Sequence, residues 1–203
     1  MFMEKLFNKY DYEGVSVHDP GLARYVSLNP VVLPHSHGRH TKQQFAKRHV
    51  NVVERLVNKL MRGGTGEKTS GKVIRTNGSL QGKKSKALRI VEKAFAKIAD
   101  KTKKNPIQVL IDAIQNAAPR EDFTRVSFGG VSYQVAVDVS AQRRLDMALR
   151  NITLAAIMGS FDKKKTLSDA LADEIELAAK NDVASSYAIK KRDETERMAK
   201  SAR

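Results

Sequence analysis

The chain has 203 residues, 41% of them hydrophobic and 29% charged, which is enough for one sizeable core or for one domain with tails. It has no cysteine, which excludes a disulfide framework and a cysteine-based zinc site, and it lacks the long apolar run of a membrane helix or signal peptide. The formal net charge of +15 points to a nucleic acid or another anionic partner. We therefore expect a soluble, cytoplasmic protein without a membrane partner.

Residues 1–41 show little hydrophobic periodicity and contain three of the five prolines. They predict an extended N-terminal arm, with a short turn of helix near residues 22–26. The spacing of His35, His37 and His40 resembles that of metal ligands. No carboxylate or thiol stands beside them and their neighbours are basic, so we favour a basic loop and predict no metal and no cofactor.

A helical domain is predicted over residues 42–183. Its first helix is expected over residues 42–61, because Val50, Val53, Val57 and Leu60 recur at helical spacing. Arg55 and Arg62 fall on the opposite side of that helix. Gly63-Gly64 is expected to end it.

Positive charge is concentrated in the middle of the chain. Residues 35–104 carry 19 basic and 4 acidic side chains, whereas the charges of the two flanks cancel. Residues 62–82 are rich in Gly, Ser, Thr and Lys and predict a long mobile basic loop. Within it, Gly66 and Gly71-Lys72 have the spacing of a phosphate-binding loop, but Val73 replaces the required hydroxyl, so we expect no nucleotide site.

Three lysines, Lys83, Lys84 and Lys86, lead into a second amphipathic helix whose inner face includes Leu88 and Phe95. The helix dipole favours acidic rather than basic side chains at this end. The cluster therefore indicates an external anion.

The next helix is expected to start at Asn105-Pro106, an N-cap followed by a first-turn proline, and to stop at Pro119. Beyond it, apolar residues occupy every second position from Val131 to Val139. Gly129-Gly130 separates this run from Val126 and Phe128. The pattern predicts a β-hairpin over residues 124–139 that projects as a two-stranded ribbon.

The period changes to helical at Ser140, and the new helix has Arg143 and Arg150 opposite its apolar face. Thr166 and Asp169 resemble a capping box for the following helix. Residues 184–203 are highly charged and predict an exposed C-terminal helix, supported by the pairs Asp193/Arg197 and Glu196/Lys200. We expect this helix either to fray or to need a partner.

These elements together predict a mainly α fold. It is a domain of about six helices, with a two-stranded β-ribbon between the third or fourth helix and the next. The chain has no paired acid and base, no nucleophile with a candidate base and no cofactor loop, so we expect no enzymatic activity. A basic DNA-binding architectural protein remains an alternative, although no dimerising heptad or helix-turn-helix is evident.

Four stretches resemble one family when they are taken together. They are VERLVNKLM (residues 53–61), GKKSKALRIVEKAF (82–95), GGVSYQVAVDVSAQRRLDMALR (129–150) and AIKKRDETERMA (188–199). In this order they resemble the universal small-subunit ribosomal protein seven family over roughly residues 40–200. The long arm and the inserted residues 62–81 resemble the archaeal and eukaryotic form, so contacts of the short bacterial link are not carried over.

The resemblance implies a protein that binds the 3′ major (head) domain of small-subunit rRNA and nucleates assembly of the head. It also implies proximity to exit-site tRNA, to the mRNA exit channel and to neighbouring proteins of the head and platform, with no homo-oligomer. The positions expected to face rRNA are basic side chains of the loops and helices: Arg39, Lys42, Arg55, Lys59, Arg62, Lys72, Lys83, Lys84, Lys86, Arg143, Arg144 and Arg150. Those expected near tRNA and mRNA are the ribbon tip and a basic patch of the last helix: Phe128, Gly129, Gly130, Val131, Lys190, Lys191 and Arg192.

Overall fold

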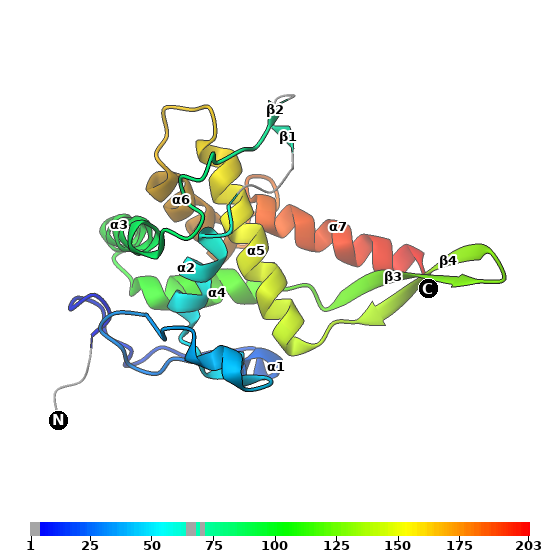
Figure 1. Ribbon diagram of the computed structural model, residues 1–203, viewed down its shortest axis with the longest axis horizontal. Coiled ribbons are helices and arrows are strands. Elements are labelled where there is room, and N and C mark those ends of the chain that lie inside the picture. The colour runs from blue at the N-terminus through cyan, green and yellow to red at the C-terminus, as the bar shows by residue number, and fades with distance from the viewer. Residues whose placement is uncertain (1–4, 64–67, 70–71) are drawn as a thin grey trace.

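A computed structural model describes residues 5–63, 68–69 and 72–203 of the chain. Within these ranges there are seven α-helices, one of them only four residues long, and two antiparallel hairpins (Figure 1). In chain order the elements are α1 Pro20–Ala23, α2 Val52–Leu60, β1 Lys68–Thr69, β2 Lys72–Val73, α3 Lys84–Thr102, α4 Pro106–Ala117, β3 Glu121–Phe128, β4 Val131–Asp138, α5 Ala141–Ser160, α6 Leu167–Ala179 and α7 Tyr187–Ser201. The predicted mainly helical fold, with a ribbon between α4 and α5, is confirmed.

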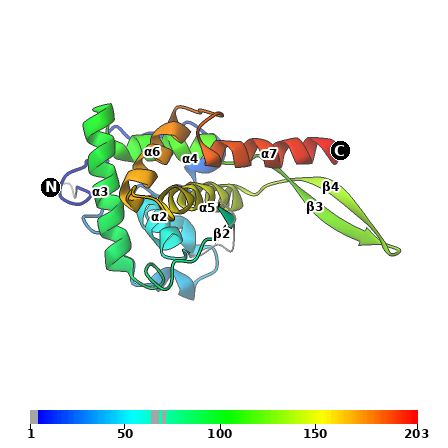
Figure 2. The same ribbon diagram turned by 90° about the horizontal axis from the view of Figure 1, so that it is seen from above.

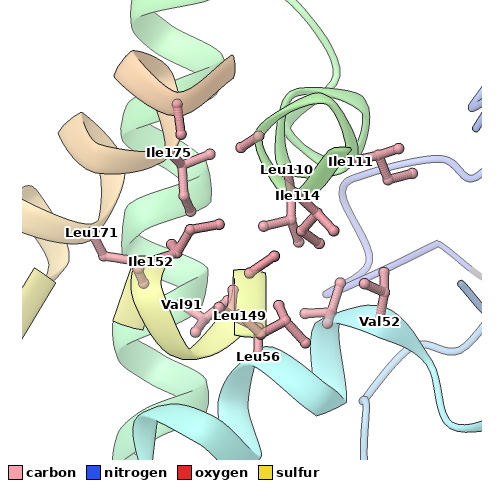
Figure 3. Packing of buried hydrophobic residues seen from close by; sticks show 14 of the residues in the cluster. Val52, Leu56, Val91, Leu110, Ile111, Ile114, Leu149, Ile152, Leu171 and Ile175 are labelled. Carbon is pink, nitrogen blue, oxygen red and sulfur yellow. The ribbon is translucent and has the colours of Figure 1, made fainter. Parts of the chain in front are cut away.

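Helices α2 to α6 enclose one hydrophobic cluster, and α5 contacts α2, α4, α6 and α7. Leu56 of α2, Leu110 of α4 and Leu149 of α5 point toward one another near its centre (Figure 3), and all three side chains are fully buried. Burying such side chains is the main source of folding free energy. The core therefore fixes α2 and α5 side by side, and their outer faces become one surface.

Polar side chains define the helix starts. The side chain of Asn51 accepts a hydrogen bond from the N–H of Val53, that of Asn105 from Ile107 and that of Thr166 from Asp169. Each bond satisfies a backbone donor that the helix itself leaves unpaired. The predicted caps at Asn105 and Thr166 are confirmed.

The first predicted helix, over residues 42–61, starts too early. Arg39–Lys42 and Ala46–His49 form two separate 3-10 turns, and Phe45 between them has a φ of 59°. The α-helix begins only at Val52, after the Asn51 cap. The sequence carried a signal for this start, because Glu54 stands three residues after Asn51, as in a capping box. Val50 has helical spacing to Val53 and Val57, but its backbone is extended.

The ribbon is paired in register from Glu121 with Asp138 to Phe128 with Val131. The ribbon therefore begins at Glu121, three residues before the predicted start at residue 124. Gly129 and Gly130 form the turn with φ values of 57° and 81°, which glycine adopts without a steric penalty. The ribbon extends away from the helices in both ribbon views (Figures 1 and 2).

The charged C-terminal segment forms helix α7, and the partner that it was expected to need is the base of the ribbon, against which it lies. A carboxylate oxygen of Glu196 accepts a hydrogen bond from the backbone N–H of Arg120 at 3.0 Å. Arg203 forms an ion pair with Glu121 of β3. The predicted pairs Asp193/Arg197 and Glu196/Lys200 are not ion pairs in the described chain, because the ribbon and nearer side chains take these partners.

Residues 5–41 have little regular structure apart from α1 and a 3-10 turn, and they pack on the helices rather than extending from them. Leu6 and Leu22 are fully buried in the common core. The hydroxyl of Tyr12 accepts a hydrogen bond from the side-chain amide of Asn51 at 2.9 Å. The N-terminal segment thus supports the start of α2.

Candidate nucleic-acid interface

A basic hollow in the described surface lies between the end of α2 and the middle of α5. Lys59, Arg62, Arg150 and Thr153 line a cavity of about 300 Å³, which we name the α2–α5 groove. Arg62 and Arg150 are exposed, and neither forms an ion pair with a described residue. The lysine of the groove is different, since its side chain is only 18% exposed.

One carboxylate, Asp146 of α5, organises the cations beneath this groove. Its oxygens lie 2.5 Å from Lys47 Nζ, 3.1 Å from Arg55 Nη2 and 3.7 Å from Lys59 Nζ. Burial alone would raise the pKa of Asp146. The hydrogen bond from Lys47 and the charges of Arg55 and Lys59 outweigh burial, and the pKa is lowered. Asp146 is therefore held ionised and fixes a 3-10 turn and α2 onto α5.

Arg55 requires a correction. It was predicted to project from the polar side of its helix, but its side chain is 2% exposed and turned toward Asp146. It also donates a hydrogen bond to the carbonyl oxygen of Tyr25 at 3.2 Å. A buried guanidinium with these partners does not reach a phosphate directly, so its role is to support the groove from below.

The balance of charge at Lys59 shows that the groove has an excess of positive potential. Burial lowers the pKa of Lys59, and Asp146 acts in the opposite direction. The charges of Lys47, Arg62 and Arg150 lower this pKa further. A single carboxylate faces several cations here, so an anion placed in the groove would relieve their repulsion.

The three lysines at the start of α3 are not equivalent. Lys84 Nζ lies 2.6 Å from a carboxylate oxygen of Glu54, and the two side chains are only 18% and 4% exposed. Lys84 is thus tied to α2, whereas Lys83 and Lys86 are exposed and form no ion pair with a described residue. A positive charge is unfavourable at a helix N-terminus. For Lys84 the carboxylate of Glu54 offsets this cost, whereas no described carboxylate does so for Lys83 or Lys86.

Arg39, Lys42 and Lys72 are exposed, as an RNA-facing role requires. Lys72 lies near the α5–α6 connection, where its Nζ is 2.6 Å from Asp162 in an exposed pair. The phosphate-loop glycines Gly66 and Gly71 lie outside the described residues, which omit 64–67 and 70–71 of the predicted loop 62–82. Arg39 and Lys42 belong to a 3-10 turn close to the α2 cap.

The arginines at the start of α5 differ in exposure. Arg143 is 66% exposed and lies 3.3 Å from Asp122 of the ribbon. Arg144 is 11% exposed, with its Nη2 2.7 Å from Asp19 and its Nε donating to the carbonyl oxygen of Pro119 at 3.2 Å. Arg144 thus links the N-terminal segment to α5 and is nearly buried, whereas Arg143 and Arg150 are exposed.

At the ribbon tip the expected residues are exposed. Phe128 is 82% exposed, and Gly129, Gly130 and Val131 surround it at the turn. The same face continues with exposed Tyr133 and further apolar side chains. The tip therefore presents an aromatic ring with no covering side chain, far from the helical core (Figure 2).

In α7, Lys190 is exposed while its two basic neighbours are engaged. Lys191 Nζ lies 2.8 Å from Glu194. Arg192 donates hydrogen bonds to the carbonyl oxygen of Asn116 at 2.5 Å and to the side chain of Asn181 at 3.0 Å. Of this predicted patch, Arg192 serves mainly to hold α7 on α4.

The three closely spaced histidines do not converge on a metal site. The rings of His35 and His37 stack with centroids 4.0 Å apart, and His35 Nδ1 lies 3.0 Å from Lys84 Nζ. His40 Nδ1 lies 3.3 Å from the hydroxyl of Ser36. Within the described residues, no group of three or more His, Cys, Asp or Glu side chains could hold a metal ion.

Sequence reasoning missed the acidic members of this surface. Glu54 and Asp146 are single carboxylates in basic surroundings, and each captures cations that the sequence assigned to RNA. Lys47, which joins Asp146 from a 3-10 turn, was also missed.

None of the helices in the described chain is long and apolar enough to span a membrane.

Comparison with known proteins gives consistent matches along the chain. The family model for ribosomal protein S7p/S5e matches residues 22–203. The small ribosomal subunit protein uS7 of Methanococcus maripaludis (strain C6) is 48% identical over 199 residues, which cover 98% of each chain. The protein of the same name from Methanothermobacter thermautotrophicus is 46% identical over 200 residues, 98% of this chain and 100% of the relative. The chain therefore belongs to the ribosomal protein S7p/S5e family, and these two relatives are archaeal.

Proposed function

We propose that this protein is a structural, non-catalytic component of the small ribosomal subunit that binds the head (3′ major) domain of its rRNA and nucleates folding of the head. The observation that carries the proposal is the α2–α5 groove, where Arg62 and Arg150 form no ion pair with a described residue and lie beside half-buried Lys59. The family supports a ribosomal role. Folded rRNA is recognised mainly through phosphates, 2′-hydroxyls and shape, which suits cations held on rigid helices.

The proposed rRNA surface contains the exposed cations and half-buried Lys59, which lines the groove, and it excludes the other buried cations. Lys59 and Arg62 of the groove and Arg143 and Arg150 of α5 form its centre. Lys83 and Lys86 at α3 and the loop residues Arg39, Lys42 and Lys72 extend it. Arg55, Lys84 and Arg144 support this surface through Asp146, Glu54 and Asp19, respectively.

The salt dependence of binding tests this part of the proposal. If roughly six to ten phosphates are neutralised, the logarithm of affinity for a head-domain rRNA fragment should fall with the logarithm of salt concentration, with a slope of about −4 to −9. Filter binding or fluorescence anisotropy over a salt series measures the slope. A slope near zero would contradict phosphate anchoring, and equally strong competition by duplex DNA would favour a DNA-binding architectural protein instead.

We propose in addition that the ribbon tip and the exposed Lys190, in the first turn of α7, lie near exit-site tRNA and the mRNA exit channel. Phe128 supports this role because an exposed aromatic ring can stack on an unpaired base. The ribbon carries few cations of its own, which separates its role from anchoring. Neighbouring small-subunit proteins would complete this environment.

A shortened ribbon tests whether the ribbon tip contributes to rRNA binding or only to contacts near tRNA. Removing residues 127, 128, 131 and 132 shortens both strands equally and keeps Gly129-Gly130 as the turn, since Val126 pairs with Tyr133. Affinity for the rRNA fragment should stay within about threefold of wild type, because the phosphate contacts remain. Exit-site tRNA crosslinking in reconstituted subunits should fall. A loss of rRNA binding would show that the ribbon belongs to the anchor.

A further inference from the structure

A second basic cavity lies beyond the α2–α5 groove, near the end of α5. It has a volume of about 360 Å³ and is bounded by residues 75–80, the first turns of α3 and the α5–α6 connection. Among the described residues that line the two cavities, only Ile157 is common to both. Arg150 and Ser160 are ten positions apart on α5, which separates the two sites by roughly 15 Å along the helix.

Three of the described cations line this cavity; Lys165 is paired with Asp173 at 2.5 Å, and the other two are open to a ligand. Arg75 and Lys86 line it, are exposed and form no ion pair with a described residue. The carboxylate that lines it, Asp162, is already paired with Lys72 at 2.6 Å. The pairing removes the main repulsion that an incoming phosphate would meet. The cavity therefore has net positive charge at its rim.

Its walls are apolar and incompletely covered. Ile90 and Phe161 line the cavity and remain half-buried although they pack on the core. The hydroxyls of Ser79 and Ser160 also line it, and each donates a hydrogen bond to a backbone carbonyl of its own segment. A cavity with apolar walls, nearby hydroxyl groups and a cationic rim differs from a simple phosphate contact, for which a flat basic surface is sufficient.

This combination matches a nucleotide whose base is unpaired. A base needs an apolar or aromatic surface to replace its stacking partners, and its phosphate needs cations a few ångströms away. Phe161 and Ile90 supply the first, and Arg75 and Lys86 supply the second. The volume is within the range of pockets that hold small ligands.

We propose that this second basic cavity binds one unpaired nucleotide of the same RNA that occupies the α2–α5 groove. The proposal rests on the proposed rRNA-binding function and adds a separate contact to it. The RNA strand follows α5 from Arg150 toward Ser160, with its phosphate at Arg75 and Lys86 and its base against Phe161. None of these contacts requires a change in the fold.

Two variants test the two halves of this site. Arg75→Gln with Lys86→Gln removes the cations, and affinity for the head-domain rRNA fragment should fall about tenfold, with a salt slope less negative by about 1 to 2. Ser79→Leu fills the cavity without changing charge. It should lower affinity by about three- to tenfold while leaving the salt slope unchanged, because only stacking is lost.

The matched control is Lys104→Gln with Lys180→Gln. These lysines are exposed, form no ion pair with a described residue and lie at the opposite ends of α3 and α6 from the cavity, so the same charge change should alter affinity by less than about threefold. Thermal unfolding checks that each variant is folded. Chemical footprinting should show one protected nucleotide lost in both cavity variants.

The outcomes separate this proposal from the proposed function. If wild-type binding is steeply salt-dependent but the Arg75/Lys86 variant behaves like the control, the second cavity is not an RNA site. If Ser79→Leu has wild-type affinity and footprint, no base enters the cavity and the nucleotide assignment is wrong. A flat salt response of the wild type would instead refute the proposed function itself.

Discussion

Asp146→Asn is expected to lower the free energy of unfolding by about 3 to 5 kcal/mol, because it leaves the buried guanidinium of Arg55 without a counter-charge. The same change removes the anion that Lys47 and Lys59 share. For a domain of this size the unfolding midpoint should fall by about 6 to 20 °C. Urea unfolding followed by circular dichroism measures the free energy, and calorimetry measures the midpoint.

Asp162→Asn is the matched control, since it removes the same charge from the exposed pair with Lys72. Exposed pairs contribute little, so its effect should stay below about 1 kcal/mol. If the two variants were equally stable, the buried network would not hold α2 on α5. That result would also remove the support inferred for the groove.

The effect of pH on the stability of Asp146→Asn has a defined sign. The folded-state pKa of Asp146 is lowered, so its ionised form contributes stability that is complete above the unfolded-state pKa of about 3.9. This contribution is lost as the pH falls from there through the lower folded-state pKa. The stability difference between wild type and Asp146→Asn should therefore be constant near neutrality and shrink in acid. A difference that grew in acid would contradict the assignment.

Arg62→Gln with Arg150→Gln should weaken binding to the head-domain rRNA fragment by about 10- to 100-fold at low salt, since each exposed guanidinium contributes a charged hydrogen bond to phosphate. The salt slope should become less negative by about 2. Neither side chain forms an ion pair within the described chain, so protein stability should change little. Anisotropy titrations at several salt concentrations measure affinity and slope together.

Lys104→Gln with Lys180→Gln serves again as the charge-matched comparison. Should it weaken binding as much as the groove variant, the rRNA would be attracted by net charge alone rather than by a defined surface. Head assembly in reconstituted particles gives an independent readout. It should be delayed only by the groove variant.

Most of the core was predictable because it follows from local spacing. The apolar face predicted for the helix after Ser140, opposite Arg143 and Arg150, consists of Leu145, Leu149 and Ile152 of α5, which are fully buried. The Gly129-Gly130 turn was equally local, since a two-residue turn between alternating strands requires positive φ. These features depend on neighbours within about ten residues.

The candidate site was harder to predict because its charges meet across the fold. Periodicity placed Arg55 on the polar side of α2, but it cannot show that Asp146, which is 91 residues later, covers that position. The same holds for Arg144, whose partner Asp19 is 125 residues away. A polar helix face is therefore not the same as an exposed one. Which cations remain unpaired depends on where carboxylates that are distant in the sequence, such as Asp146 and Asp19, lie in the folded chain.

The ribbon has a mechanical consequence that follows from its support by α7. Its strands have eight residues each and span roughly 26 Å, while the contacts that orient it, from Glu196 and Arg203, lie at the base. The ribbon is thus a lever with its pivot beside the C-terminus of the chain. A rotation of about 10° at the pivot would move Phe128 by roughly 5 Å. We therefore expect a change in the contacts of Glu196 or Arg203 at the base to alter the direction of the tip, although neither side chain lies near the tip.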